Sequence, residues 1–237
     1  MFATALRSVR LPGRRRRAHD PTSLVAASLT SDRTLRLGAV VPRTRAEGPG
    51  ERFAVWVQGC SVRCSGCFNP HLWGPSLGQE VRVADLVADA VSAGVEGVTL
   101  LGGEPFDQAP GAAEFATGVR EAGLSVMTFT GFVREYLEGP KSPDGADRLL
   151  AATDLLVDGP YLADRRDPHR PWVGSTNQRF HFITDRYRDL RLDVLPDRLE
   201  VRVGKDGEIA INGWAGVDQL DALLADVAGS VGRGRVR

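Results

Sequence analysis

The pattern of apolar and polar residues predicts strands that alternate with helices. Four short, continuously apolar runs have the length expected of buried strands: residues 53–58, 97–101, 124–129 and 155–157. Three segments are predicted to be helices, the first two from apolar residues recurring at helical spacing: residues 82–93, 110–122 and 145–152. Such alternation indicates a parallel sheet with right-handed crossovers. We therefore expect an α/β fold in which helices cover the sheet.

Beyond this core, the pattern predicts a short extension at the carboxyl terminus. Residues 199–203 and 208–211 alternate around a glycine-containing turn, which predicts a β-hairpin. Apolar residues at helical spacing then predict a final helix near 216–228. The extension is expected to span residues 186–229, and residues 230–237 are expected to form a frayed tail.

The amino terminus has a different composition. Residues 1–34 are basic and poor in acidic residues, and they include the run Arg14-Arg15-Arg16-Arg17. Without interleaved aromatic residues, this segment is expected to be a disordered extension, or the product of a start codon assigned too far upstream. The core domain is expected to span residues 35–185.

Charge and cysteine usage narrow the functional classes. The 237 residues carry 30 Lys and Arg against 30 Asp and Glu, so the total charge does not predict nucleic-acid or membrane binding. The sequence has no apolar run of the roughly 20 residues that a membrane span needs. The 3 cysteines share one short loop and cannot pair off, which favours a reducing, cytoplasmic compartment.

All cysteines of the chain follow the first predicted strand. Cys60, Cys64 and Cys67 have the spacing C-x3-C-x2-C. Thiolates suit iron–sulfur clusters, zinc or copper. A [4Fe–4S] cluster normally takes four cysteines, so three would leave one iron open to another ligand. Zinc could instead use the three cysteines and His71. The spacing therefore predicts a metal site without deciding which metal it holds.

The cysteine spacing resembles that of the radical S-adenosylmethionine (radical SAM) enzymes. The wider context resembles the glycyl-radical-enzyme activating proteins, especially that of the anaerobic ribonucleotide reductase. Six motifs carry this resemblance from about residue 35 to 179: residues 48–52, 67–70, 102–105, 130–132, 154–161 and 174–179. The resemblance implies a partial (β/α) barrel with mostly parallel strands, open on one side, to which the predicted hairpin and helix are added.

The resemblance also implies an activity. Cys60, Cys64 and Cys67 would bind three irons of a [4Fe–4S] cluster, and S-adenosylmethionine would chelate the fourth. Reductive cleavage of S-adenosylmethionine would give a 5′-deoxyadenosyl radical. We therefore expect a radical SAM oxidoreductase that makes a glycyl radical on a partner, either an anaerobic ribonucleotide reductase or a formate-lyase-like enzyme. The electron donor would be a protein such as flavodoxin or ferredoxin.

Two other interpretations remain open. A stand-alone radical SAM enzyme could act on a small molecule or a peptide. A non-catalytic zinc-binding or iron–sulfur module is the third interpretation. An iron and sulfide assay separates the third interpretation from the other two.

Further candidate residues follow the carboxyl ends of the predicted strands, where chemistry sits in such folds. The resemblance assigns the loop at 102–105 to the methionine amino group of the cofactor, although Glu104 could instead cap the next helix. Thr130, Gly131 and Asp158 are candidates for the nucleoside pocket, and Phe68 could pack near the adenine. The expected cofactor-binding residues are Phe68, Asn69, Gly102, Gly103, Glu104, Pro105, Thr130 and Asp158.

Other polar residues in the motifs have no single interpretation. Arg52 could support the site, meet a partner or form a structural ion pair. Asn177, Gln178 and Arg179 are ambiguous in the same way. His71 is predicted to be a loop histidine and not a metal ligand.

Overall fold

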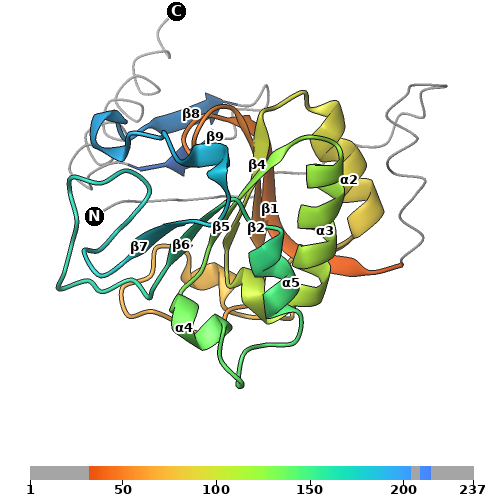
Figure 1. Ribbon diagram of the computed structural model, residues 1–237, viewed down its shortest axis with the longest axis horizontal. Helices are drawn as coiled ribbons and strands as arrows, with labels where there is room; N and C mark the ends of the chain where they lie inside the picture. Colours follow the sequence, from red (N-terminus) through yellow and green to blue (C-terminus); the bar gives the residue numbers. More distant parts are fainter. Residues whose placement is uncertain (1–31, 204–208, 215–237) are drawn as a thin grey trace, which may run out of the picture.

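The computed structural model describes residues 32–203 and 209–214 (Figure 1). Its main element is a seven-stranded sheet with the strand order β3-β1-β2-β4-β5-β6-β7. The strands are β1 (Thr34–Thr44), β2 (Arg52–Val57), β3 (Gln79–Arg82), β4 (Gly97–Gly102), β5 (Ser125–Phe129), β6 (Leu155–Asp158) and β7 (Arg179–Phe182). The α-helices are α2 (Val83–Ser92), α3 (Ala109–Glu121), α4 (Arg134–Leu137) and α5 (Ala146–Ala151).

The centre of the sheet consists of the parallel strands β2, β4, β5 and β6. Their registers align Arg52 with Gly97, Gly97 with Ser125, and Met127 with Leu155. These strands coincide with the four apolar runs, and α2, α3 and α5 coincide with the three predicted helices. Because both faces of these strands are covered, their sequences are almost continuously apolar. The expected α/β fold is confirmed.

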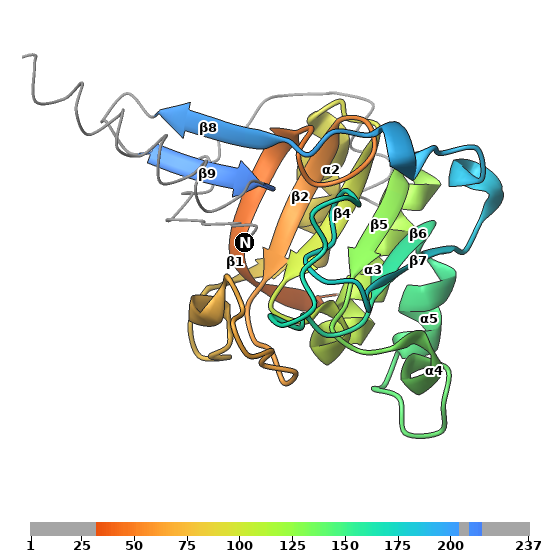
Figure 2. The ribbon, with the colours of Figure 1, turned by 90° about the vertical axis from the view of Figure 1, so that its left-hand side faces the viewer.

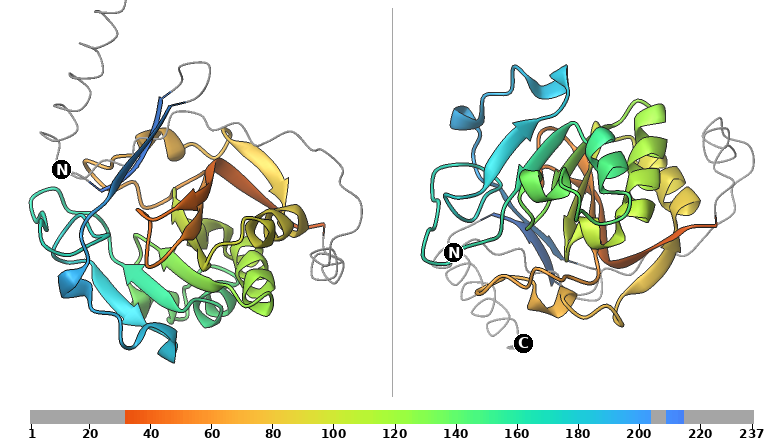
Figure 3. Two further views of the ribbon diagram at one scale, coloured as in Figure 1. Left: turned by 90° about the horizontal axis from the view of Figure 1, so that it is seen from above. Right: turned by 60° about the horizontal axis from the view of Figure 1, so that its bottom comes forward.

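Three further strands are antiparallel additions that the apolar pattern did not predict. β1 pairs with both β2 and β3, and β7 pairs with β6. The register of β1 is irregular at two places, β3 is short and largely polar, and β7 has only 4 residues, too few for an alternation to be distinguished. β3 and β7 are the two edges of the sheet, which remains open as expected for a partial barrel (Figure 3).

Helices cover one face of the sheet (Figure 1). Helix α3 lies between α2 and α5 and contacts both. The apolar residues at helical spacing face the core: Val83, Leu86, Val87 and Ala90 in α2 and Ala112, Phe115, Ala116 and Val119 in α3 are buried, and Val91 in α2 is partly buried. Burying each large apolar side chain contributes about 1.5–3 kcal/mol, so this layer supplies much of the stability of the fold.

Irregular chain covers the opposite face of the sheet. Trp172 and Val173 pack against Met127, Leu155 and Val157 of β5 and β6. Partly buried residues between 180 and 195 extend this cluster. The segment includes the short 3₁₀ turns Asp185–Tyr187 and Leu192–Val194. Between β6 and β7, residues 160–178 form no helix or strand of the sheet.

The predicted hairpin is present. Strands β8 (Leu199–Val203) and β9 (Ile209–Gly213) form a separate antiparallel sheet, on the side of the main sheet that faces away from α2 and α3 (Figures 1 and 2). The hairpin turn, the helix predicted near 216–228, the tail at 230–237 and the extension up to residue 31 lie outside the described residues. Within the described residues, no helix has the length and apolar character needed to cross a membrane.

Candidate functional site

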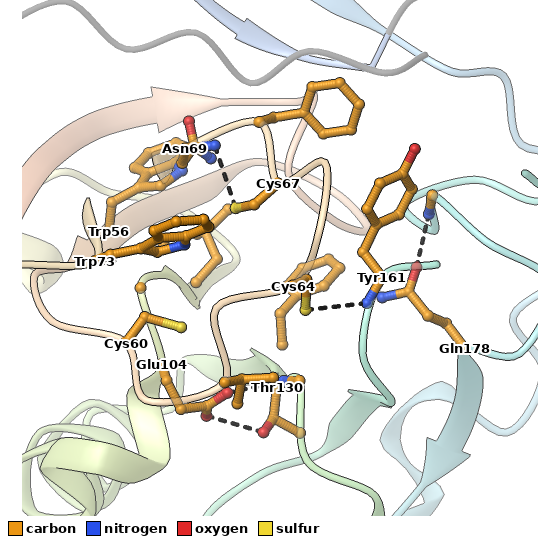
Figure 4. A pocket seen from close by; sticks show the side chains of 18 of the residues that line it. Trp56, Cys60, Cys64, Cys67, Asn69, Trp73, Glu104, Thr130, Tyr161 and Gln178 are labelled. Atoms are coloured by element: carbon orange, nitrogen blue, oxygen red, sulfur yellow. Dashed lines mark hydrogen bonds between the residues drawn. The ribbon is translucent and has the colours of Figure 1, made fainter. Parts of the chain in front are cut away.

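The carboxyl ends of the four parallel strands border one pocket (Figure 4). Each strand, or the loop that follows it, contributes to the wall. The lining residues are Trp56, Cys60, Val62, Cys64, Cys67, Phe68, Asn69, Trp73, Leu101, Gly102, Gly103, Glu104, Phe129, Thr130, Gly131, Gly159, Tyr161, Gly174, Gln178 and Trp214. The expected gathering of the motifs at one edge of the sheet is thus observed, although the lining residues come from positions up to 158 apart in the sequence.

The three cysteines lie on the loop that leaves β2. Backbone hydrogen bonds fold this loop back on itself, from Gly59 N to Leu72 O (2.8 Å) and from Cys60 N to Trp73 O (3.2 Å). All three thiols are free and partly exposed. Backbone N–H groups point at two sulfurs: Asn69 N donates to Cys67 Sγ (3.4 Å) and Tyr161 N to Cys64 Sγ (3.3 Å). Such bonds stabilise a metal-bound thiolate.

Burial favours the protonated form of two of the thiols. Burial raises the pKa of Cys60 to about 11, and burial also raises the pKa of Cys64. A metal must therefore displace protons from these thiols when it binds.

Gly102 and Gly103 are required by close packing of strand ends. Gly102 has φ +107°, and a Cβ on it would lie 2.7 Å from Trp56 Cα. A Cβ on Gly103 would lie 2.1 Å from the carbonyl oxygen of Gly59. Only glycine fits at either position, because the end of β4 lies directly against β2 and the start of the cysteine loop. These two glycines therefore help to set the position of the cysteines.

Glu104 links the ends of β4 and β5. Its carboxylate accepts hydrogen bonds from Phe106 N (3.0 Å), Thr130 Oγ1 (2.8 Å) and Gly131 N (2.8 Å). The bond from Phe106 caps the 3₁₀ turn Pro105–Gln108, so the capping role proposed from the sequence is present. Burial raises the pKa of Glu104 to about 7. The side chain also lines the pocket, and a carboxylate has about four acceptor positions, so one remains for a bound donor.

Residues 46–181 match the family model of the 4Fe-4S single cluster domain, which is more than half of the chain. Over 148 residues the chain is 32% identical to the anaerobic ribonucleoside-triphosphate reductase-activating protein of Vibrio cholerae, covering 91% of that protein and 58% of this chain. The chain belongs to the radical SAM activating proteins. The cofactors of this family are a [4Fe–4S] cluster and S-adenosylmethionine.

A second relative is matched over a smaller share of its length. The pyruvate formate-lyase-activating enzyme of Listeria monocytogenes is 34% identical over 128 residues, which are 51% of that enzyme and 52% of this chain. Among solved structures, QueE from Escherichia coli matches with a TM-score of 0.37 and 16% identity, over 48% of this chain and 59% of that one.

The pocket of this radical SAM protein fits a bound cluster and cofactor. Three of its buried polar atoms have no hydrogen-bond partner among the described residues: Trp56 Nε1, Trp73 Nε1 and Asn69 Oδ1. Buried polar groups are normally satisfied, so these atoms indicate that a polar group binds here. Figure 4 shows both indoles on the wall that carries Cys60 and Cys67.

The family match favours a cluster over a single zinc ion. Among the described residues, no three His, Cys, Asp or Glu side chains converge on one point where a single ion could sit. A [4Fe–4S] cluster needs a wider arrangement, because each cysteine binds a different iron. His71 is exposed and does not line the pocket, so it is not placed as a fourth ligand.

Two of the expected cofactor-binding residues do not line the pocket. Pro105 is buried at the start of a 3₁₀ turn. Asp158 is fully buried, accepts hydrogen bonds from Arg179 (2.6 Å) and Arg134 N (2.6 Å), and lies 3.1 Å from His181 Nε2. Burial alone would raise the pKa of Asp158, but these neighbours outweigh burial and lower it. Asp158 therefore joins β6 to β7 and α4.

The ambiguous residues at 177–179 now have separate positions. Gln178 lines the pocket, and its Oε1 accepts from Gly174 N (2.8 Å). The Asn177 side chain donates to Pro160 O (2.7 Å). Arg179 bridges Glu135 and Asp158. Of these three residues, only Gln178 lines the pocket and can contact a ligand there directly.

Apart from Phe68, the aromatic side chains of the pocket were not predicted from the sequence. Trp56, Trp73, Phe129, Tyr161 and Trp214 all line the pocket. Trp56 and Phe129 lie within strands, where their composition indicates burial and nothing more. Trp214 comes from the carboxyl-terminal hairpin, outside the residues that the family model matches. No local pattern in the sequence connects these positions.

Proposed function

We propose that this protein cleaves S-adenosylmethionine reductively and takes a hydrogen atom from a glycine of a partner enzyme. One observation carries the proposal: the chain has only 3 cysteines and all of them line one pocket, so a four-iron cluster keeps one iron free of protein ligands. When bound, the cluster and cofactor supply one-electron cleavage of the C5′–S bond to methionine and a 5′-deoxyadenosyl radical, which abstracts the glycine hydrogen.

The residues of the chain would bind, orient and shield these groups. Cys60, Cys64 and Cys67 would hold three irons, supported by the N–H groups of Asn69 and Tyr161. The remaining acceptor position of Glu104 suits the cofactor's ammonium group. The rings of Phe68 and Tyr161 lie 5.4 Å apart beside the cysteines and would restrict the access of water.

An anaerobic ribonucleotide reductase is the partner that we propose first. The match covers 91% of the reductase-activating protein from Vibrio cholerae but only 51% of the formate-lyase-activating enzyme from Listeria monocytogenes. A formate-lyase-like enzyme is the second candidate partner. A small one-electron carrier such as flavodoxin or ferredoxin would reduce the cluster.

A stand-alone radical SAM enzyme acting on a small molecule or a peptide is the second candidate function. One observation favours it: Trp214, beyond the residues matched by the family model, closes part of the pocket. A wall of this kind could shape the pocket for a different substrate.

An anaerobic assay decides between these functions. Reconstituted protein, a reductant and S-adenosylmethionine are mixed with each candidate partner, and electron paramagnetic resonance is used to detect a glycyl radical. The proposal predicts that the radical forms on the reductase together with 5′-deoxyadenosine. Formation of 5′-deoxyadenosine without a radical on either partner would favour the stand-alone enzyme.

The cysteines supply the most direct prediction. Replacing Cys60, Cys64 or Cys67 with alanine should remove the iron and sulfide and abolish cleavage of S-adenosylmethionine, because two cysteines cannot retain the cluster. Iron and sulfide content, visible absorption and 5′-deoxyadenosine are measured. Ser65→Ala, in the same loop, is the matched control and should behave as wild type. A cysteine variant that still cleaves the cofactor would refute the assignment, and so would a wild-type protein that binds zinc alone.

A further inference from the structure

The β8–β9 hairpin is fastened to the loop that follows β1. Asn212 in β9 is fully buried and donates to Thr44 Oγ1 (3.0 Å) and to Glu47 Oε1 (3.1 Å). In the opposite direction, Arg45 N donates to Glu200 Oε1 (2.7 Å). An isolated two-stranded hairpin is marginally stable in water, so these bonds to the main body hold it in place.

The end of the hairpin is fixed as closely as its centre. Gly213 has φ +109°, and a Cβ on it would lie 2.1 Å from Arg198 O and 2.7 Å from Ala46 Cβ. The next residue, Trp214, donates its backbone N–H to Arg198 O (2.7 Å). The chain therefore passes through a turn that only glycine fits, and Trp214 leaves this turn in a defined direction.

Trp214 reaches the cysteine pocket from this anchored position. Its indole stacks on Phe129, the last residue of β5, with ring centroids 6.4 Å apart and planes inclined by 26°. Both rings line the pocket that contains Cys60, Cys64 and Cys67. A segment outside the matched family region thus supplies part of the wall of the site.

The chemistry of the wall defines what it can bind. Among the described residues, Glu104 is the only lining residue with a carboxyl, amino, guanidinium or imidazole group, and three donors already engage its carboxylate. Five lining residues are glycines, which expose backbone to a ligand: Gly102, Gly103, Gly131, Gly159 and Gly174. Beyond the groups that hold the cluster and cofactor, aromatic faces and bare backbone suit an uncharged, extended peptide segment.

We propose that Trp214, held by the β8–β9 hairpin, is a substrate-positioning residue that packs against an uncharged, glycine-containing segment of the partner enzyme. The inference rests on the proposed function. The cofactors are shared by the whole family, so the matched region, residues 46–181, contains what binds them. Trp214 lies outside that region. We therefore assign it to the part of the reaction that differs between members of the family, which is the partner enzyme that supplies the hydrogen atom.

The test measures binding and coupling separately. A fluorescently labelled, uncharged glycine-containing peptide from the partner is titrated with the cluster-loaded protein and S-adenosylmethionine, without reductant, and its anisotropy is followed. Under reducing conditions, the glycyl radical formed per 5′-deoxyadenosine is determined. Trp214→Ala should weaken peptide binding and lower the radical yield per 5′-deoxyadenosine, each about tenfold, as expected for loss of a packed aromatic contact. Trp214→Phe should recover part of both.

Two variants in the hairpin serve as controls. Asn212→Ala removes the anchor and should reproduce the defect of Trp214→Ala. Val203→Ala changes a residue of β8 that is 70% exposed, and should behave as wild type.

The inference is overturned if Trp214→Ala binds the peptide and couples as wild type does. It is also overturned if Trp214→Ala loses binding of S-adenosylmethionine in equilibrium dialysis, since the indole would then belong to the cofactor site. Failure of the proposed function has a different signature, because the wild-type protein itself would then produce no glycyl radical on either partner.

Discussion

At the scale of single residues, two buried charged side chains act at opposite ends of the parallel strands. Glu104 joins the carboxyl ends of β4 and β5 beside the cysteines. Arg52 lies at the amino end of β2, about 20 Å away along a six-residue strand. Its guanidinium donates to Thr99 Oγ1 (3.0 Å), Ser125 Oγ (2.6 Å) and Tyr187 OH (2.9 Å). Among the described residues, Arg52 forms no ion pair, and its guanidinium donates to uncharged hydroxyl and carbonyl oxygens. Its role is therefore structural.

Replacing Arg52 with lysine should destabilise the fold without acting on the site. A lysine cannot reach acceptors on two strands and a 3₁₀ turn at once, so several buried hydroxyl and carbonyl oxygens lose their donor, at a cost of about 2–4 kcal/mol. Anaerobic urea unfolding measures the change. Arg36→Lys, at a partly exposed ion pair with Glu80, is the control and should change stability by less than about 1 kcal/mol. Unchanged stability with lost partner activation would assign Arg52 to the partner surface.

At the scale of elements, the hairpin and the loop after β1 stabilise each other through buried polar groups. Glu47 is fully buried, and its Oε2 has no hydrogen-bond partner among the described residues. Burial raises the pKa of Glu47 to about 7, although the hydrogen bond from Asn212 opposes this shift. The folded protein therefore favours protonated Glu47, and its contribution to stability is complete below about pH 4.5 and lost as the pH rises through about 7.

Replacing Glu47 with glutamine should remove this pH dependence. The amide oxygen can still accept from Asn212, while no charge has to be buried. The free energy of unfolding of the variant should match that of the wild type near pH 5. At pH 8 it should be higher by up to about 3 kcal/mol, which is the free-energy equivalent of the pKa shift of Glu47. Chemical unfolding at both pH values measures the difference. Glu121→Gln, at an exposed position on α3, is the control. A difference that does not vary with pH would contradict the prediction.

At the scale of the whole molecule, the described residues form a seven-stranded sheet, a helical layer and the lining of the pocket. β1 begins at Thr34, and Leu35 and Leu37 are already part of the main core. The fold therefore needs the chain from about residue 34 onwards.

Deleting residues 1–30 should consequently leave the fold, the cluster content and the activity intact. The measurements are the unfolding midpoint, bound iron and 5′-deoxyadenosine formation. A deletion that continues through Gly38 is the matched control, and it should unfold the protein because it removes the first half of β1 and two core leucines. Loss of solubility or activity in the shorter deletion would show that residues 1–30 contribute to the protein.

Features that depend on neighbours along the chain could be predicted from the sequence. A continuous apolar run or a helical repeat reports the burial of one element, so the parallel strands and α2, α3 and α5 were found close to their positions. The cysteine spacing is likewise local. From it and the motifs around it we predicted the cluster, the family and the edge of the sheet where the site lies. The hairpin was also predicted, because its turn and its alternating strands are contiguous.

Tertiary structure decided what depends on residues distant in sequence. β3 and β7 have only 4 residues each, too few to be recognised without the strands that they pair with. The carboxylate of Asp158 is engaged by Arg179 and Arg134, which reach it from β7 and α4. Trp214 enters the pocket because Asn212 bonds to Thr44, 168 positions earlier. The sequence alone determined the chemistry, while packing between remote segments determined which side chains surround it.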